Sequence, residues 1–153
     1  MKLVTYSTPG NAPRLGALVD DSIVDLHDAS DGRLPSNMLA FLEAGDAASE
    51  LARKISASAA PATSLDEAVL EAPVPNPSKI VAIGLNYMDH IREAQIPVPE
   101  VATMFCKYPS AITGPLSEIR WSTSLTSQVD YEAELAVVIG RTARNVAEDD
   151  AYE

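Results

Sequence analysis

The sequence contains a single cysteine, Cys106, and only two histidines, His27 and His90. One thiol excludes an intramolecular disulfide, and it excludes a zinc site built from several cysteines of this chain. Basic residues are also scarce: 11 Lys and Arg stand against 22 Asp and Glu, so the formal net charge is −11. This balance argues against nucleic acid as a partner, because nucleic acid binds clusters of Lys and Arg.

Long hydrophobic runs are missing as well. No apolar stretch approaches the ~20 residues of a membrane-spanning helix, and the N-terminus, MKLVTYSTPG, lacks the apolar segment of a secretory signal. We therefore expect a cytoplasmic protein with no membrane partner.

A proline-rich stretch divides the chain. Prolines alternate in APVPNPSK, which predicts an extended linker over residues 73–78. Before it, short apolar segments separated by turn formers predict strands over 1–27, with a hairpin turn at Asp20-Asp21. Apolar spacing then predicts one or two helices broken near Gly45, the first capped by Ser36. Residues 1–72 would form a small N-terminal domain.

The second part of the chain, residues 79–153, reads as strands around a short helix. KIVAIGLNY and TMFCKYPSAITGP predict strands, MDHIREA predicts one or two helical turns, and Asn145 could cap a last helix. The whole chain is therefore expected to be mainly β with some helix, an α+β protein. Because the last helix has barely begun at Glu153, we expect this second part to be truncated.

The segment QVDYEAELAVVIG, residues 128–140, alternates acids with other residues before an apolar run. If it is a strand, Glu132 and Glu134 point to one face with Cα atoms ~6.5–7 Å apart. Two carboxylates this close favour a hard cation between them, such as Mg²⁺, Mn²⁺ or Ca²⁺. The alternative is an ordinary charged face turned to solvent.

The segment NYMDHIREA carries His90 and Glu93 three residues apart, so one helical turn would place both on the same side. A carboxylate beside an imidazole favours proton transfer from water. The alternative is that Glu93 pairs with Arg92 or with solvent.

Lys107 is either a partner for a substrate carboxylate or a surface lysine, and Cys106 is expected to be a buried structural thiol.

These segments, in this order and spacing, resemble the core of the fumarylacetoacetate hydrolase family. The matching residues are KIVAIGLNYMDHIREA, MFCKYPSAITGP and QVDYEAELAVVIGRTARNVAEDDAYE. The resemblance implies a mixed β-roll fold over residues 79–153, preceded by a small N-terminal domain. It implies Mg²⁺ or Mn²⁺ on Glu132 and Glu134, His90 and Glu93 as the water-activating pair, and a homodimer that acts on 2-oxo acids.

The function expected from this resemblance is a hydrolase that cleaves a C–C bond of an acylpyruvate-like or 1,3-dicarbonyl acid through a metal-stabilised enolate. Lys107 would help to bind the substrate. Two alternatives stay open within the family, a decarboxylase or lyase of the oxaloacetate type and an isomerase. A third belongs to another class: the family's further carboxylate ligand is missing here, so the chain could be an inactive fragment or a half completed by a partner.

Overall fold

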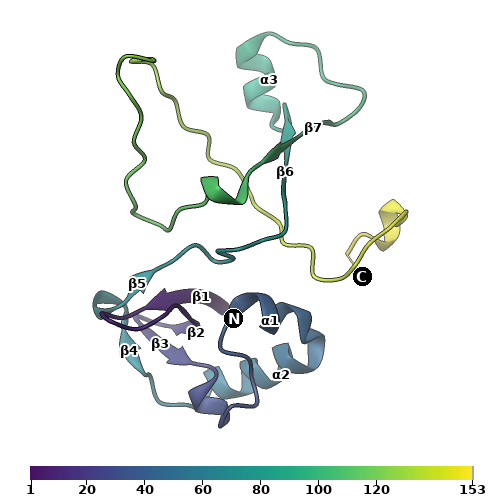
Figure 1. The fold of residues 1–153 in the computed structure, drawn as a ribbon. Coiled ribbons are helices and arrows are strands. Elements are labelled where there is room, and N and C mark those ends of the chain that lie inside the picture. Colours follow the sequence, from purple (N-terminus) through teal and green to yellow (C-terminus); the bar gives the residue numbers. More distant parts are fainter. Residues whose placement is uncertain (153) are drawn as a thin grey trace.

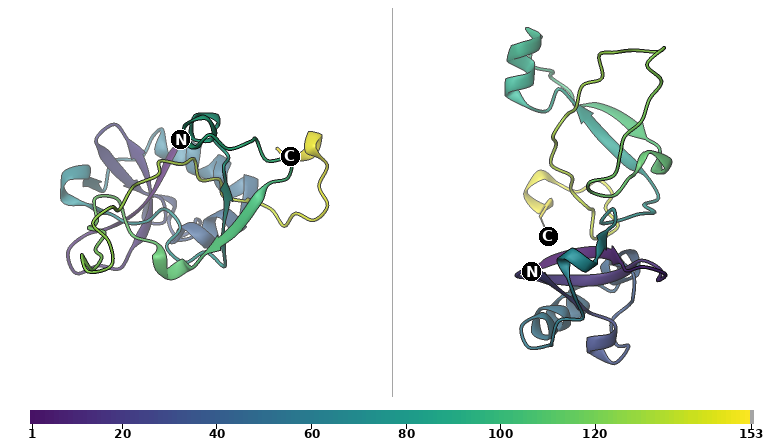
Figure 2. Two further views of the ribbon diagram at one scale, coloured as in Figure 1. Left: turned by 90° about the horizontal axis from the view of Figure 1, so that it is seen from above. Right: turned by 90° about the vertical axis from the view of Figure 1, so that its left-hand side faces the viewer.

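The computed structural model describes residues 1–152, which form two parts connected by irregular chain (Figure 1). The first part is a five-stranded sheet of order β4-β3-β2-β1-β5 with two helices, and the second is a two-stranded sheet, β6-β7, beside a short helix. Two further views show the irregular chain that follows β7 running back between the parts (Figure 2). This architecture confirms the α+β fold class. None of the helices in residues 1–152 is long and apolar enough to cross a membrane.

Three consecutive antiparallel strands form the centre of the first sheet, and short strands lie at its two edges. The β2–β3 connection is a two-residue turn, because Val19 pairs with Ser22 and Asp20 adopts a left-handed conformation with φ 51°. Aspartate tolerates this conformation better than most residues, so the hairpin predicted at Asp20-Asp21 is confirmed. The strands are β1 (Lys2–Ser7), β2 (Arg14–Val19), β3 (Ser22–Asp25), β4 (Thr63–Ser64) and β5 (Val69–Leu70), with the 3₁₀ turn η2 (Leu65–Glu67) between the last two.

The helical segment breaks at Gly45, as its spacing predicts. Helix α1 (Met38–Glu43) and helix α2 (Gly45–Ser56) meet there, and Gly45 has φ 71°, which favours glycine. The predicted cap at Ser36 is wrong, because Asn37 is the residue whose side chain accepts from the first turn, at Ala40 N (2.9 Å). The Ser36 carbonyl instead accepts from Leu15 N at 2.8 Å, which ties the helix entrance to β2.

The main hydrophobic core lies between one face of this sheet and helices α1 and α2 (Figure 1). It begins with alternate residues of β2 and β3, which point to the helix side. The turn η1 (Asp28–Ser30) follows β3 and leads into the helices. The buried members of the core are Leu15, Ala17, Val24, Leu26, Leu34, Met38, Phe41, Ala48, Ala52 and Ile55.

The second part contains the two predicted strands and the predicted helix between them, and the structure pairs these strands as an antiparallel hairpin. Pairing runs from Ile80 opposite Lys107 to Gly84 opposite Thr103. Within residues 80–152, Ile91 is the one residue that is buried. The elements are β6 (Ile80–Gly84), α3 (Met88–Ala94), β7 (Thr103–Lys107) and the 3₁₀ turns η3 (Pro109–Ala111) and η4 (Glu148–Asp150).

The strand predicted over residues 128–140 is absent from the structure, and this prediction is wrong. The whole segment has irregular backbone and exposed side chains, including Leu135 at 82% and Ile139 at 73%. A strand requires a neighbour that pairs its N–H and C=O groups, and residues 1–152 place none beside it. The predicted cap Asn145 also differs, because Ala147 precedes the short turn η4.

The irregular chain after β7 contacts the first part through Arg141 and through Gly114. Arg141 forms an ion pair with Asp46 of α2 at 2.7 Å. Gly114 packs against the backbone beside β5, where a Cβ atom would come within 2.9 Å of the Leu70 carbonyl oxygen. A glycine is therefore required for this close approach.

We predict that Gly16→Ala destabilises the first part by about 1–3 kcal/mol, the range for overpacking a core. A Cβ atom at Gly16 would lie 2.4 Å from Ile23 Cγ2 and 3.0 Å from the Tyr6 ring. Urea unfolding followed by circular dichroism measures the change. The matched control is Gly140→Ala, where a Cβ atom meets nothing within 4 Å, and equal unfolding midpoints for the two variants would contradict the prediction.

Candidate functional site

The predicted histidine–glutamate pair lies on α3. Leu85 turns the chain out of β6 in the left-handed conformation (φ 53°), which costs a leucine roughly 1–2 kcal/mol, and Tyr87 then precedes the first helical residue with extended angles. Ile91 packs inward at 5% exposure, whereas His90 and Glu93 are exposed. Helix α3 therefore packs inward through Ile91, and the side chains of His90 and Glu93 are accessible to solvent.

Of the two alternatives considered for Glu93, the structure shows exposure to solvent and no pairing with Arg92. Arg92 donates to Asp89 Oδ1 at 2.9 Å, one turn away, rather than to Glu93. Among residues 1–152, no hydrogen bond joins His90 to Glu93. The catalytic pair thus stays a prediction, with both side chains available to other groups.

The carboxylate segment approaches α3 through a single hydrogen bond. Leu135 N, which immediately follows Glu134, donates to Tyr87 Oη at 2.7 Å. Glu132 and Glu134 are themselves exposed. This contact joins the two segments that the sequence singled out separately, and nothing in the sequence pattern indicated Tyr87 as the residue that joins them.

The carboxylates of this region are the type of ligand that a hard divalent cation binds, but there are too few of them to complete a site. Carboxylate oxygens are the ligands that Mg²⁺ and Mn²⁺ prefer, and Glu132 and Glu134 supply two. Within residues 1–152 no group of three or more His, Cys, Asp and Glu side chains gathers in a way that could hold a metal ion. The ligand set that Glu132 and Glu134 begin is therefore incomplete in this part of the chain.

Lys107 lies at the end of the β6-β7 hairpin away from α3. It pairs with Ile80 at one end of the hairpin, whereas α3 leaves from the other end, after Gly84. Its Nζ lies 6.0 Å from the centroid of the Phe105 ring, at the outer limit of a cation–π contact. Cys106, expected to be buried, is exposed, because no further layer covers the β6-β7 sheet at this point.

A shallow hollow of about 290 Å³ lies beside α3. Asn86 supplies its polar side chain, and neither His90 nor Glu93 lines it. Ile91 forms part of its wall. The lining residues are Ile83, Gly84, Leu85, Asn86, Met88, Ile91, Val98, Pro99 and Ala102.

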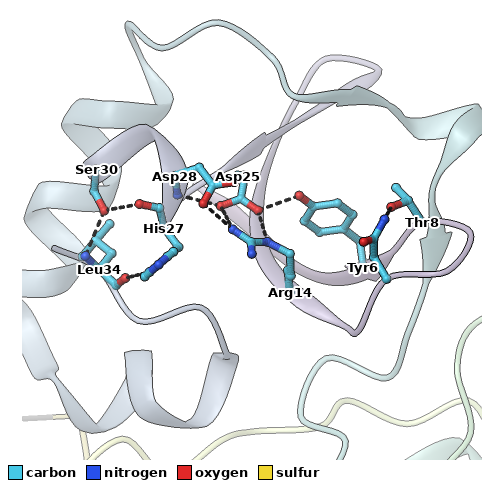
Figure 3. A network of polar contacts seen from close by, with 9 residues as sticks. Tyr6, Thr8, Arg14, Asp25, His27, Asp28, Ser30 and Leu34 are labelled. Carbon is cyan, nitrogen blue, oxygen red and sulfur yellow. Dashed lines mark hydrogen bonds and ion pairs between the residues drawn. The ribbon is translucent and has the colours of Figure 1, made fainter. Parts of the chain in front are cut away.

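A second polar arrangement, which the sequence analysis missed, lies on the sheet face opposite the helices (Figure 3). Asp25 is buried and accepts from Tyr6 Oη at 2.8 Å, from Arg14 Nε at 2.5 Å and Nη2 at 2.9 Å, and from Asp28 N at 2.9 Å. Arg14 also donates to Asp28 Oδ1 at 2.6 Å. Gly16 makes the arrangement possible, because its missing side chain lets the Tyr6 ring lie across β2 toward Asp25.

The pKa values of these groups follow from burial and hydrogen bonding. Burial raises the pKa of Tyr6 to about 12, and the hydrogen bond to Asp25 adds to this effect. Burial alone would raise the pKa of Asp25, but the hydrogen bonds from Arg14, Asp28 N and Tyr6 outweigh it and hold that pKa below its usual value. The network is thus charged and satisfied at neutral pH.

The network borders a hollow of about 270 Å³, yet its geometry indicates a structural role. All of the buried carboxylate's partners come from its own sheet and the adjoining turn. His27, the second histidine, is likewise structural, because its Nδ1 lies 2.6 Å from the Leu34 carbonyl oxygen and donates to it. Sequence alternation could not reveal the network, since Tyr6, Arg14 and Asp25 each fit an ordinary strand.

Comparison with known proteins places the chain in a family. Residues 79–153 match the family model described as "Fumarylacetoacetate (FAA) hydrolase C-terminal". A solved structure, "Crystal structure of a putative HpcE protein from Mycobacterium smegmatis", is similar with a TM-score of 0.64 and 32% identity, covering 80% of this chain and 41% of that one. Residues 79–153 of the chain belong to the fumarylacetoacetate hydrolase family.

Several relatives carry the name of one activity. The chain is 40% identical to "Oxaloacetate tautomerase fahd2, mitochondrial" of Xenopus laevis, over 100% of this chain and 48% of the relative. It is 37% identical to "Oxaloacetate tautomerase FAHD2A, mitochondrial" of Homo sapiens, over 99% and 48%. The chain spans about half the length of the curated relatives it matches. The cytoplasmic location and the homodimer expected from the sequence stay predictions.

We predict that the stability of the first part falls as the pH rises from about 10 to about 12. In this window the unfolded Tyr6 loses its proton while the folded one keeps it, because its pKa is raised from 10.0 to about 12. Tyr6→Phe removes this slope and also costs about 1.5–3 kcal/mol at neutral pH, as for other hydrogen bonds to charged groups. Unfolding free energies measured across the alkaline range provide the test. Tyr131→Phe, at an 89% exposed position, is the control, and an unchanged slope in Tyr6→Phe would contradict the assignment.

Proposed function

We propose that the protein is an enzyme that interconverts the enol and keto forms of an oxaloacetate-like 2-oxo acid. The observation that carries the proposal is the identity of 37–40% to relatives named oxaloacetate tautomerases, which extends over 99–100% of this chain. The accessible histidine on α3 and the nearby carboxylate segment supply suitable groups. The C–C hydrolase expected from the sequence becomes the second candidate.

Tautomerisation needs one proton to leave the enol oxygen and one to reach the neighbouring carbon, with no net change in atoms. His90 is the group we assign to this transfer, because an imidazole exchanges protons readily near neutral pH. Glu93, one turn away on α3, would orient the ring. Both groups are exposed on α3, so a small acid could reach them without opening of the helix.

Glu132 and Glu134 would hold the divalent ion, Mg²⁺ or Mn²⁺, whose Lewis acidity stabilises an enolate oxygen. Water, substrate oxygens or groups outside residues 1–152 would supply the further ligands, because these residues gather no third protein candidate beside the pair. We assign no step to Lys107, because the hairpin register places it at the end away from α3.

C–C hydrolysis is favoured by the description of the matching family model, which names a hydrolase. In that reaction a water adds to the distal carbonyl, and the products are a carboxylic acid and a pyruvate-like acid. Hydrolysis in H₂¹⁸O would therefore place the label in the new carboxylate, whereas tautomerisation forms no new carboxylate. Product analysis with an acylpyruvate in labelled water separates the two reactions.

We predict that His90→Ala lowers the tautomerisation rate by about 10²–10⁴-fold, the usual contribution of a positioned acid–base group. The assay follows the disappearance of the enol form of oxaloacetate by its ultraviolet absorbance, with the full-length protein. Arg92→Ala is the matched control on the same helix, since its surface ion pair with Asp89 contributes little to stability. An unchanged rate in His90→Ala would exclude His90 from the reaction.

Removal of divalent ions should abolish the activity, and added Mg²⁺ or Mn²⁺ should restore it. Glu132→Gln should raise the Mn²⁺ concentration needed for half-maximal activity, because the substitution replaces a charged ligand by a neutral one. Glu118→Gln is the control, since Glu118 pairs with Arg120 in a separate surface contact. Full activity of the wild-type protein in excess chelator would refute the metal-dependent mechanism.

A further inference from the structure

The hydroxyl of Tyr87 connects the two candidate segments by a hydrogen bond. It accepts a hydrogen bond from Leu135 N at 2.7 Å across 48 positions of sequence. Leu135 directly follows Glu134, and Tyr87 lies three residues before His90. One side chain thus connects the backbone of the carboxylate segment with the start of the histidine helix.

The Tyr87 side of this contact is well anchored. Its carbonyl accepts from Ile91 N at 3.1 Å, which closes the first turn of α3. Ile91 is buried at 5% exposure, so movement of Tyr87 would disturb the one residue that packs α3 inward. The phenol ring therefore projects from a defined point at the helix N-terminus.

The Leu135 side has no comparable support. Residues 129–140 form no strand, and their side chains are exposed. Among the hydrogen bonds of residues 1–152, the bond to Tyr87 is the one that joins this segment to a distant part of the chain. Just beyond the segment, Arg141 pairs with Asp46 of α2, so the bond to Tyr87 is the tether that lies next to Glu134 itself.

We infer that Tyr87 is a positioning residue that holds the carboxylate pair at the N-terminal end of α3. Its phenol oxygen fixes the peptide between Glu134 and Leu135, so that the acids lie beside the helix that carries His90. The inference rests on the proposed function only in assigning the acids to a divalent ion. The hydrogen bond itself can be tested without metal or substrate.

The first test is amide hydrogen exchange on the metal-free, full-length protein. Tyr87→Phe should speed exchange at Leu135 N by about two- to tenfold, the factor that the net free energy of one hydrogen bond provides. Tyr131→Phe lies on the same segment at 89% exposure and should leave the exchange unchanged. Equal exchange in wild type and Tyr87→Phe would overturn the inference, whatever the protein's activity.

The second test is Mn²⁺ affinity, measured by titration of the full-length protein without substrate. Tyr87→Phe should weaken binding by about 10–100-fold, as loss of a group that orients metal ligands commonly does. Replacing the Leu135 amide by an ester removes the donor N–H, so it should weaken binding similarly and leave Tyr87→Phe without further effect. Faster exchange with unchanged Mn²⁺ affinity would overturn the positioning role.

The two proposals fail in different ways. Weaker Mn²⁺ binding in Tyr87→Phe, with no oxaloacetate tautomerisation in the wild type, supports the positioning role and refutes the proposed reaction. Tautomerisation that is unaffected by Tyr87→Phe, together with unchanged Mn²⁺ affinity, refutes the positioning role and leaves the reaction in place.

Discussion

Pairing of backbone N–H and C=O groups is the constraint on which the structure depends. Extended segments become strands only where a neighbour accepts and donates these hydrogen bonds. Strands β1 to β5 satisfy one another, and β6 pairs fully with β7. Residues 128–140 have the composition of a strand, yet without a neighbour in residues 1–152 they remain irregular. Tyr87 supplies a single acceptor there, to Leu135 N.

The two parts of the chain also differ in how many side chains they bury. The first part has a continuous core under α1 and α2, and on its other face the charged Asp25 is buried with every partner it needs. The second part buries Ile91 and leaves large apolar side chains such as Val137 exposed at 75%. The first part is thus held by packing and a polar network, and the second by strand pairing and local turns.

The candidate site combines residues whose chemistry suits acid–base and metal-dependent reactions of small acids. His90 and Glu93 share a helix turn, and Glu132 and Glu134 lie on the segment whose Leu135 N donates to Tyr87 Oη. The match of residues 79–153 to the family model agrees with these residue types, and several relatives are named oxaloacetate tautomerases. Lys107 lies at the end of the hairpin away from α3, and its role in substrate binding stays a prediction.

The sequence by itself determined the α+β class, the Asp20-Asp21 turn, the break at Gly45 and helix α3, because spacing and turn chemistry act within a few residues. It also identified His90, Glu93, Glu132 and Glu134 as candidates, through residue type and order. Only the tertiary structure decided that residues 128–140 are irregular, that Tyr87 contacts Leu135, and that Tyr6, Arg14 and Asp25 form a network. Each depends on groups brought together from distant positions, which local pattern does not encode.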